Sequence, residues 1–161
     1  MKKVSCIRMI FLIGLYSLVA NFVHPISPTL YKLLNFPDYM FGVAFAAMAL
    51  TNFACSPCWG SLFNRYGCAK LTAVAFFGYA FSQYLFSVAT TELSLTFARF
   101  VAGIFISGIS CSQIIYQMKN APEDNKGQYM MYNATTVAVI SPMGYLIGGF
   151  LGDYSLKLCM N

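Results

Sequence analysis

The spacing of charged residues constrains the fold of this chain more than any other feature. Lys, Arg, Asp and Glu make up 9% of its 161 residues, whereas ordinary soluble domains carry about 25%. Five long windows hold almost none of these charges, and the single exception within them is Arg99. The windows are Met9–Tyr31, Tyr39–Asn64, Leu71–Thr91, Leu93–Met118 and Gly127–Gly152. A water-soluble fold of this composition would have too few charges to cover its surface.

Each window is long enough to cross a lipid bilayer as a helix. The windows are 21 to 26 residues long, and a helix needs roughly 20 mostly apolar residues to cross the hydrocarbon core. Lipid offers no partner for exposed backbone groups, and the windows lack the two-residue alternation of a membrane barrel strand. The sequence therefore predicts an all-α integral membrane protein with five transmembrane helices, at about residues 9–32, 39–63, 71–91, 93–118 and 128–152.

The distribution of basic residues predicts the orientation in the membrane. Lys2, Lys3 and Arg8 precede an apolar run as in a signal peptide, but no small-x-small cleavage site follows, so an uncleaved first helix is the better interpretation. Lys and Arg collect in cytoplasmic loops. With the N-terminus inside, the inner segments hold seven basic residues and the outer segments two. We therefore expect a multi-pass protein of the cell membrane with a cytoplasmic N-terminus and the lipid bilayer as its first partner.

Two features that suggest other functions have simpler explanations. Cys55-Ser56-Pro57-Cys58 has the spacing of a redox or zinc motif, but it lies in an apolar window without the polar surroundings that thiolate chemistry needs. Small apolar cysteines beside a helix-bending proline are the better interpretation. The net charge of +5 comes from scattered basic residues rather than one patch. We therefore expect no metal, no cofactor and no nucleic-acid partner.

The turn between the second and third windows carries the most specific motif. Residues 60–70 read GSLFNRYGCAK, which is similar to the loop 2–3 signature of the major facilitator superfamily. The family has Asp where this chain has Asn64, and a basic pair where this chain has only Lys70. Gly60 is expected to allow close helix approach and Gly67 a tight turn. Arg65 and Lys70 are expected to anchor the loop at the membrane surface.

Three further segments resemble the same superfamily. Residues 25–28, PISP, resemble the P-x-x-P element in helix 1 of twelve-helix drug:proton antiporters. Residues 99–103 look like the R-x-x-x-G motif of helix 4. Residues 144–149 are similar to the antiporter signature G-P-x-x-G-G of helix 5, with Tyr145 in place of the proline. The resemblance thus extends over nearly the whole chain, in the family's order.

This resemblance implies a transporter rather than an enzyme. Members of the superfamily have two halves, each built from inverted three-helix repeats. Residues 1–161 would be a partial N-terminal bundle, truncated before the sixth helix, which a missing C-terminal half or another copy would complete. The implied function is secondary transport of a small organic solute by alternating access, with drug/proton antiport as the nearest case. The alternative is a non-transporting membrane remnant or assembly partner.

Arg99 and His24 are the leading candidates for pathway residues. A charge within a membrane helix is costly and usually faces a cavity or a partner; otherwise its long side chain reaches the headgroups. None of the five acidic residues lies in a window, so proton coupling within this chain would need His24, whose type titrates near neutral pH. The alternative for His24 is an anchor at the membrane interface.

Amides and glycines complete the candidate set. Asn21, Gln83, Gln113 and Asn133 lie in apolar windows, where an amide contacts the solute or hydrogen-bonds a neighbouring helix. Small residues let membrane helices approach closely, and Gly144, Gly148 and Gly152 in the last window repeat every four residues, which places them on one face of a helix. The resemblance adds that this face could slide during transport. The predicted packing residues are Gly144, Gly148, Gly149 and Gly152.

Overall fold

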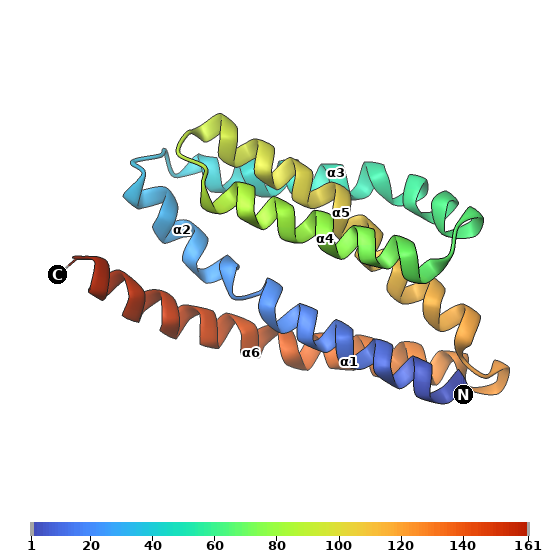
Figure 1. The fold of residues 1–161 in the computed structure, drawn as a ribbon. Helices are drawn as coiled ribbons and strands as arrows, with labels where there is room; N and C mark the ends of the chain where they lie inside the picture. The colour runs from blue at the N-terminus through green and yellow to red at the C-terminus, as the bar shows by residue number, and fades with distance from the viewer. Residues whose placement is uncertain (1, 161) are drawn as a thin grey trace. The chain divides into compact units, whose positions relative to one another are not determined.

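The computed structural model describes the backbone of residues 2–160 and the side chains of residues 6–22, 24–152 and 154. Every regular element in this part of the chain is helical, which confirms the predicted all-α class (Figure 1). In chain order the elements are α1 (Lys2–Ala20), α2 (Val23–Leu33), α3 (Tyr39–Arg65), α4 (Cys68–Ser87), α5 (Glu92–Asn120), the short 3-10 helix η1 (Glu123–Asn125) and α6 (Lys126–Met160).

Among the residues that the structure describes, four helical segments are long and apolar enough to cross a membrane: Cys6–Leu33, Tyr39–Arg65, Glu92–Asn120 and Glu123–Gly152. They correspond to the first, second, fourth and fifth predicted spans. The third predicted span is α4, a helix of 20 residues. It is not among the four segments, although its sequence is also largely apolar. The chain is therefore a multi-pass membrane protein.

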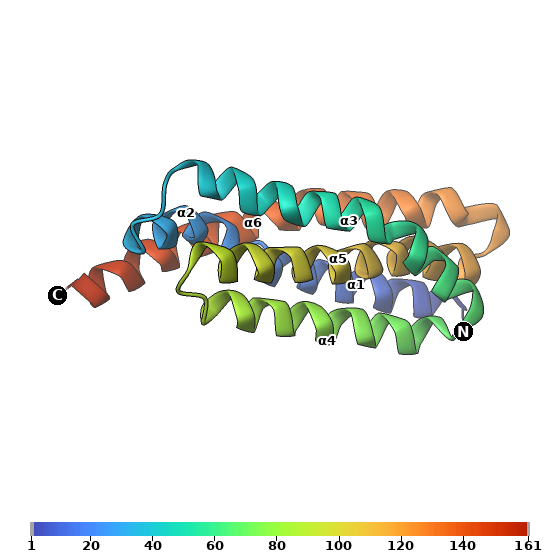
Figure 2. The same cartoon turned by 90° about the horizontal axis from the view of Figure 1, so that it is seen from above.

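The helices form two compact units, one of residues Met1–Leu33 and Gln117–Asn161 (unit 1) and one of residues Leu34–Tyr116 (unit 2). In unit 1, α6 packs along α1 and α2 and runs in the same direction as they do (Figure 1). The first and fifth crossings of a membrane must share a direction, so this arrangement agrees with the order of the spans. In unit 2, α3, α4 and α5 run in alternating directions (Figure 2).

The first predicted helix is interrupted near its middle. α1 ends at Ala20 and α2 begins at Val23. Asn21 Nδ2 donates to the Ser17 carbonyl at 2.6 Å, a local bond that competes with the helical ladder. Pro25 follows in the first turn of α2, where its missing N–H costs little. The P-x-x-P element therefore lies within α2, just beyond the interruption.

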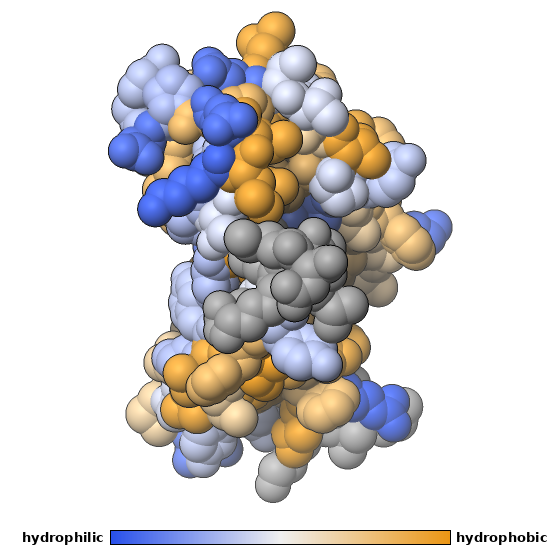
Figure 3. Space-filling model, turned by 90° about the vertical axis from the view of Figure 1, so that its left-hand side faces the viewer, coloured by the Kyte–Doolittle hydropathy of each residue, from blue (hydrophilic) through white to orange (hydrophobic). Residues whose placement is uncertain are grey.

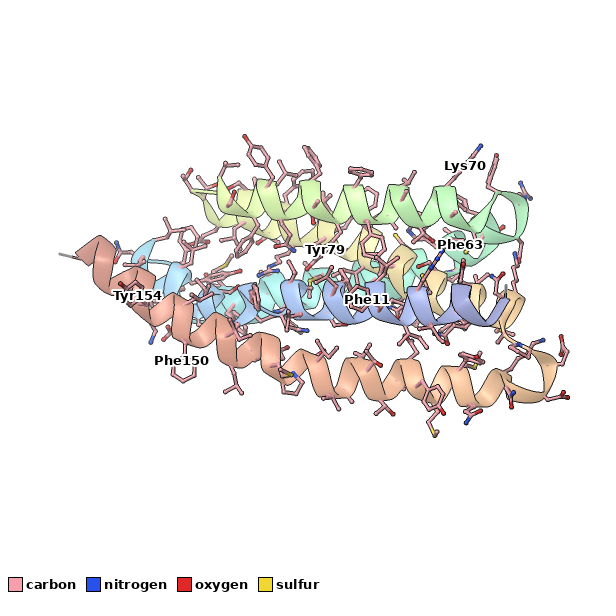
Figure 4. All side chains as sticks on the ribbon, turned by 60° about the horizontal axis from the view of Figure 1, so that its bottom comes forward. Phe11, Phe63, Lys70, Tyr79, Phe150 and Tyr154 are labelled. Atoms are coloured by element: carbon pink, nitrogen blue, oxygen red, sulfur yellow. The ribbon has the colours of Figure 1, made fainter. Side chains whose placement is uncertain are left out.

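Large apolar side chains cover much of the surface of each unit. In unit 2 the side chain of Phe53 is 80% exposed, and in unit 1 that of Phe150 is 78% exposed. Figure 4 shows Phe150 and Tyr154 pointing away from α6, and Figure 3 shows hydrophobic atoms reaching the surface beside hydrophilic ones. A soluble monomer rarely exposes so much apolar area. These surfaces suit a helix bundle surrounded by lipid.

Candidate functional site

Arg99 is buried within unit 2 and rests on an aromatic ring. Its Cζ atom lies 4.0 Å from the centroid of the Phe86 ring. The two residues are only 5% and 6% exposed. A guanidinium over a ring face is held by the ring's quadrupole, and the attraction grows as water is excluded. In this structure, then, the cation packs against α4 inside the protein.

The α4–α5 hairpin explains why these two residues meet. The Ser94 amide donates to Thr91 Oγ1 at 3.2 Å, and the Thr91 amide donates to Ser94 Oγ at 3.1 Å. These reciprocal bonds resemble a capping box and define the first turn of α5. Arg99 follows one to two turns later, and helical side chains lean toward the N-terminus of their helix. Arg99 therefore leans back toward the end of α4, where Phe86 lies.

Tyr79 and Gln83 extend the same face of α4, since they precede Phe86 by seven and three residues. Tyr79 lies within the electrostatic reach of Arg99, and its side chain is hydrogen-bonded to that of Gln83. The Oε1 atom of Gln83 is buried and accepts no hydrogen bond from any residue with a described side chain. Gln83 is thus placed near Arg99, together with Tyr79 and Phe86.

Sequence reasoning missed Tyr79 and Phe86. Both are aromatic residues in an apolar window, where a lipid-facing ring and a ring beside a cation look alike. The available signal was their spacing, because residues seven apart share one helix face. This signal becomes informative only once the hairpin shows that the face is turned toward Arg99.

The other predicted amides lie farther along α5 or in unit 1. Gln113 is half-buried on α5, 14 residues beyond Arg99, which corresponds to about 21 Å along a helix. Asn21 belongs to unit 1, where it makes its bond to Ser17. Asn133 is half-buried on α6, also in unit 1. Within unit 2, Gln83 is therefore the predicted amide that shares the face of α4 with Phe86, and Gln113 lies farther along α5.

His24 lies against α6 in unit 1. Its ring centroid is 5.8 Å from that of Tyr145, with an angle of 40° between the ring planes. Tyr145 is the residue that stands where the similar antiporter signature has proline. An imidazole beside a phenol can hydrogen-bond or stack, and its protonated form is also attracted to the ring face. The structure thus gives His24 an aromatic neighbour close to the α1–α2 interruption.

The glycines of α6 meet the backbone of the first helix. A Cβ atom on Gly144 would lie 2.6 Å from the Leu18 carbonyl oxygen, and one on Gly148 would lie 2.5 Å from the Phe22 carbonyl oxygen. A Cβ on Gly152 would lie 2.9 Å from Cγ1 of Ile26. At these three positions any side chain would collide with α1, the interruption or α2.

Gly149 differs from the other predicted packing residues. A Cβ atom at this position would meet no described atom within 4 Å. One residue along a helix turns the side chain by about 100°, so Gly149 points away from the contact that Gly148 makes. Within unit 1 Gly149 thus makes no such contact with a described atom, and its place in the packing motif stays a prediction.

The loop motif of residues 60–70 is exposed between α3 and α4. Asn64, Arg65 and Lys70 all have exposed side chains, and Figure 4 shows Lys70 pointing away from the ribbon. Gly67 has φ −63° and ψ 129°, an extended conformation that any residue can adopt. A Cβ on Gly60 or Gly67 would meet nothing within 4 Å in the described part of the chain. The connection between α3 and α4 is short, two residues that include Gly67, but within unit 2 neither glycine is required by a close contact. Their predicted roles stay predictions.

The chain is similar to known proteins along most of its length. A family model described as Major Facilitator Superfamily matches residues 9–156. The Staphyloferrin B transporter of Staphylococcus aureus (strain NCTC 8325 / PS 47) is 30% identical over 108 residues, which cover 67% of this chain and 26% of the relative. Two further relatives match almost the whole chain.

Multidrug resistance protein 2 of Bacillus subtilis (strain 168) is 20% identical over 98% of this chain and 40% of the relative. Tetracycline resistance protein, class H, of Pasteurella multocida is 25% identical over 96% of this chain and 39% of the relative. The chain thus spans between 26% and 40% of the length of these three relatives.

Proposed function

Because the chain belongs to the Major Facilitator Superfamily, we propose that it is the N-terminal portion of a secondary transporter that moves a small organic solute by alternating access. Transporters of this type carry their solute site near the middle of the bilayer, between two halves that rock against each other. The C-terminal half would supply the opposite wall of that site. The chain together with that half is called the complete carrier below.

The burial of Arg99 against Phe86 is the observation that carries the proposal. A cation inside a membrane helix marks a functional path more often than not, because keeping it there is costly. At about 10 Å from the start of α5, the side chain could have reached the headgroups. It packs on α4 instead, beside Tyr79 and Gln83. We assign this group to the solute pathway.

The names of two relatives favour drug efflux over uptake. They are a multidrug resistance protein and a tetracycline resistance protein, so the proposed direction is export of a lipophilic organic compound. The proposed location is the cell membrane with the N-terminus in the cytoplasm, supported by the excess of basic residues in the predicted inner segments. Tetracycline and ethidium are suitable probe solutes.

Replacing Arg99 tests the proposal directly. Everted membrane vesicles containing the complete carrier should accumulate at least one of the two probes, and Arg99→Ala should abolish that accumulation. Arg8→Ala is the matched control, because Arg8 is exposed near the start of the chain and the same chemical change there should leave transport intact. Wild-type accumulation by Arg99→Ala vesicles would remove Arg99 from the pathway.

Proton coupling is proposed to depend on His24. It is the only histidine of the chain, and it lies beside Tyr145 near the α1–α2 interruption. In the same vesicles, His24→Gln should retain downhill movement of the probe but lose accumulation driven by a pH gradient. Tyr145→Phe is the control, since it preserves the ring next to His24. Undiminished gradient-driven accumulation by His24→Gln would place the coupling proton elsewhere.

The coding sequence downstream of residue 161 distinguishes this proposal from its alternative. An in-frame continuation with a further set of apolar helices supports a carrier. A non-transporting membrane protein built from the same helices is the alternative, and vesicles with the expressed protein would then accumulate neither probe.

A further inference from the structure

The contact between Phe86 and Arg99 constrains how the guanidinium is presented. A guanidinium carries its five N–H donors in its own plane. The Cζ atom lies 4.0 Å from the centroid of the Phe86 ring, so the ring limits how far the guanidinium plane can tip. Lysine has the same charge and no plane, so a ring cannot orient it in this way.

The position of Phe86 also limits how far Arg99 can extend. Phe86 lies one residue before the end of α4, and Arg99 leans toward that end because side chains lean toward a helix N-terminus. A long cationic side chain in this position would otherwise extend to the headgroups. The buried ring lies in its way, and the guanidinium stops on it. Tyr79 and Gln83 lie deeper along the same face of α4.

We propose that Phe86 is a positioning residue, which keeps the guanidinium of Arg99 in the protein interior, where the solute passes. This rests on the proposed function, in which Arg99 contacts the solute pathway. Phe86 itself need not touch the solute. Its loss should therefore weaken solute binding through Arg99, with little effect on how fast the loaded carrier turns over.

The transport test uses two replacements of Phe86 in the complete carrier. Phe86→Leu removes the ring and keeps an apolar side chain, and Phe86→Trp keeps a ring that binds cations at least as well. With the probe that the wild-type carrier accumulates, Phe86→Leu should raise KM about tenfold, the loss expected for a desolvated cation–ring pair. The KM of Phe86→Trp should equal that of the wild-type carrier. Both variants should keep the wild-type maximal transport rate and the wild-type amount of carrier in the membrane.

A double substitution separates positioning from simple packing. In an Arg99→Lys background the planar group is already absent, so adding Phe86→Leu should change KM by less than about twofold. The same tenfold rise in both backgrounds would overturn the proposal, as would equal KM values for Phe86→Leu and Phe86→Trp. If Arg99→Ala impairs transport and Phe86→Leu does not, the positioning role fails while the pathway role of Arg99 stands. If Arg99→Ala has no effect, the pathway role fails, and with it the proposal for Phe86.

A fluorescence test needs no solute and uses the chain itself. Trp59 is the only tryptophan, so a Trp59→Phe/Phe86→Trp chain in detergent micelles reports only on the indole introduced at position 86. Adding Arg99→Leu should shift its emission maximum, because the stacked charge is removed. Adding Arg65→Leu, an exposed arginine on the same unit, should not. A spectrum unchanged by Arg99→Leu would show that the ring and the cation are not in contact, which overturns the proposal.

Discussion

Glycines bring helix backbones together in both units, since a Cβ on Gly103 in unit 2 would also meet a backbone carbonyl, that of Met48. Unit 2 adds hydrogen bonds between its helices. In unit 1 the glycines of α6 place backbone against backbone, with Gly144 on the carbonyl of Leu18 and Gly148 on the carbonyl of Phe22. Each glycine there leaves room for a carbonyl oxygen at a distance that no side chain would allow. We call this contact the glycine face; it repeats every four residues and consists of similar small surfaces.

In unit 2 the contact between α3 and α5 combines glycine with hydrogen bonds. The Trp59 indole Nε1 donates to the carbonyl of Ile104 at 2.7 Å. The indole ring packs against Gly108, where an added Cβ atom would lie only 2.7 Å from the ring. The thiol of Cys111 donates to the carbonyl of Ser56 at 3.6 Å. We call this contact the Trp59 seam.

The two contacts differ in which relative movements of the helices they oppose. Lipid tails are as apolar as leucine, so helices in a membrane are held by close packing and hydrogen bonds rather than by burial of apolar area. A hydrogen bond between helices is lost if one helix shifts by a turn, whereas a repeating glycine surface can meet the next carbonyl. The Trp59 seam therefore fixes the register of α3 on α5, and the glycine face fixes mainly the distance between α6 and the first helix.

Of the substitutions that test this comparison, Gly148→Ala should destabilise the chain most. The added methyl would meet the Phe22 carbonyl oxygen, Cα and carbonyl carbon at 2.5, 2.8 and 3.0 Å. All three are backbone atoms that cannot rotate away, so α6 must separate from the first helix at a cost of about 1–3 kcal/mol. The cost should appear as a lower midpoint of thermal unfolding in detergent.

Gly149→Ala is the matched control for that prediction. It makes the same change one residue along the helix, where the methyl meets no described atom within 4 Å. Alanine in a helix interior is favoured over glycine by roughly 0.5–1 kcal/mol, so this variant should unfold at or slightly above the wild-type midpoint. Equal destabilisation by the two variants would contradict the glycine face as described.

A smaller effect is expected from Trp59→Phe, which tests the hydrogen bond of the Trp59 seam. A ring still covers Gly108, but the bond to Ile104 is lost at a cost of about 0.5–1 kcal/mol. The loss stays modest because Ser107 Oγ also donates to the Ile104 carbonyl, at 2.6 Å, so that oxygen keeps a partner. Stability toward sodium dodecyl sulfate, followed by circular dichroism, is a suitable measurement.

Cys111→Ala provides the comparison for Trp59→Phe within the same seam. A thiol is a weak donor, and at 3.6 Å its bond should contribute less than about 0.5 kcal/mol. If Cys111→Ala destabilised the chain more than Trp59→Phe, the indole would not be the main contact that sets the register.

Residues 9–156 show how far the sequence alone could be interpreted. The spacing of charges predicted all-α membrane spans, because the cost of burying a charge in lipid leaves a pattern in the chain itself. The loop motif and the helix 4 and helix 5 motifs pointed to the superfamily that the family model also identifies. Such signals depend only on residue order and local chemistry.

Other features depended on which helix faces which. The interruption after Ala20, where Asn21 bonds the Ser17 carbonyl through both its backbone and its side chain, is not revealed by composition. Gly148 and Gly149 are adjacent in the sequence, and only the packing of α6 on the first helix separates their roles. The same holds for Phe86, one of 15 phenylalanines until the hairpin places Arg99 over its ring.

The sequence by itself thus determined the fold class of the protein, its location in a membrane and the charged residue that lies within a membrane-spanning segment. The hydration of charges and the hydrogen bonding of backbone groups constrain each segment separately, so their effects can be recognised in the sequence of that segment alone. The tertiary structure alone decided which groups surround Arg99, which glycines touch a neighbouring backbone and how Trp59 holds α3 to α5. Those contacts join residues far apart in the chain, and close packing selects them only when the helices are in place.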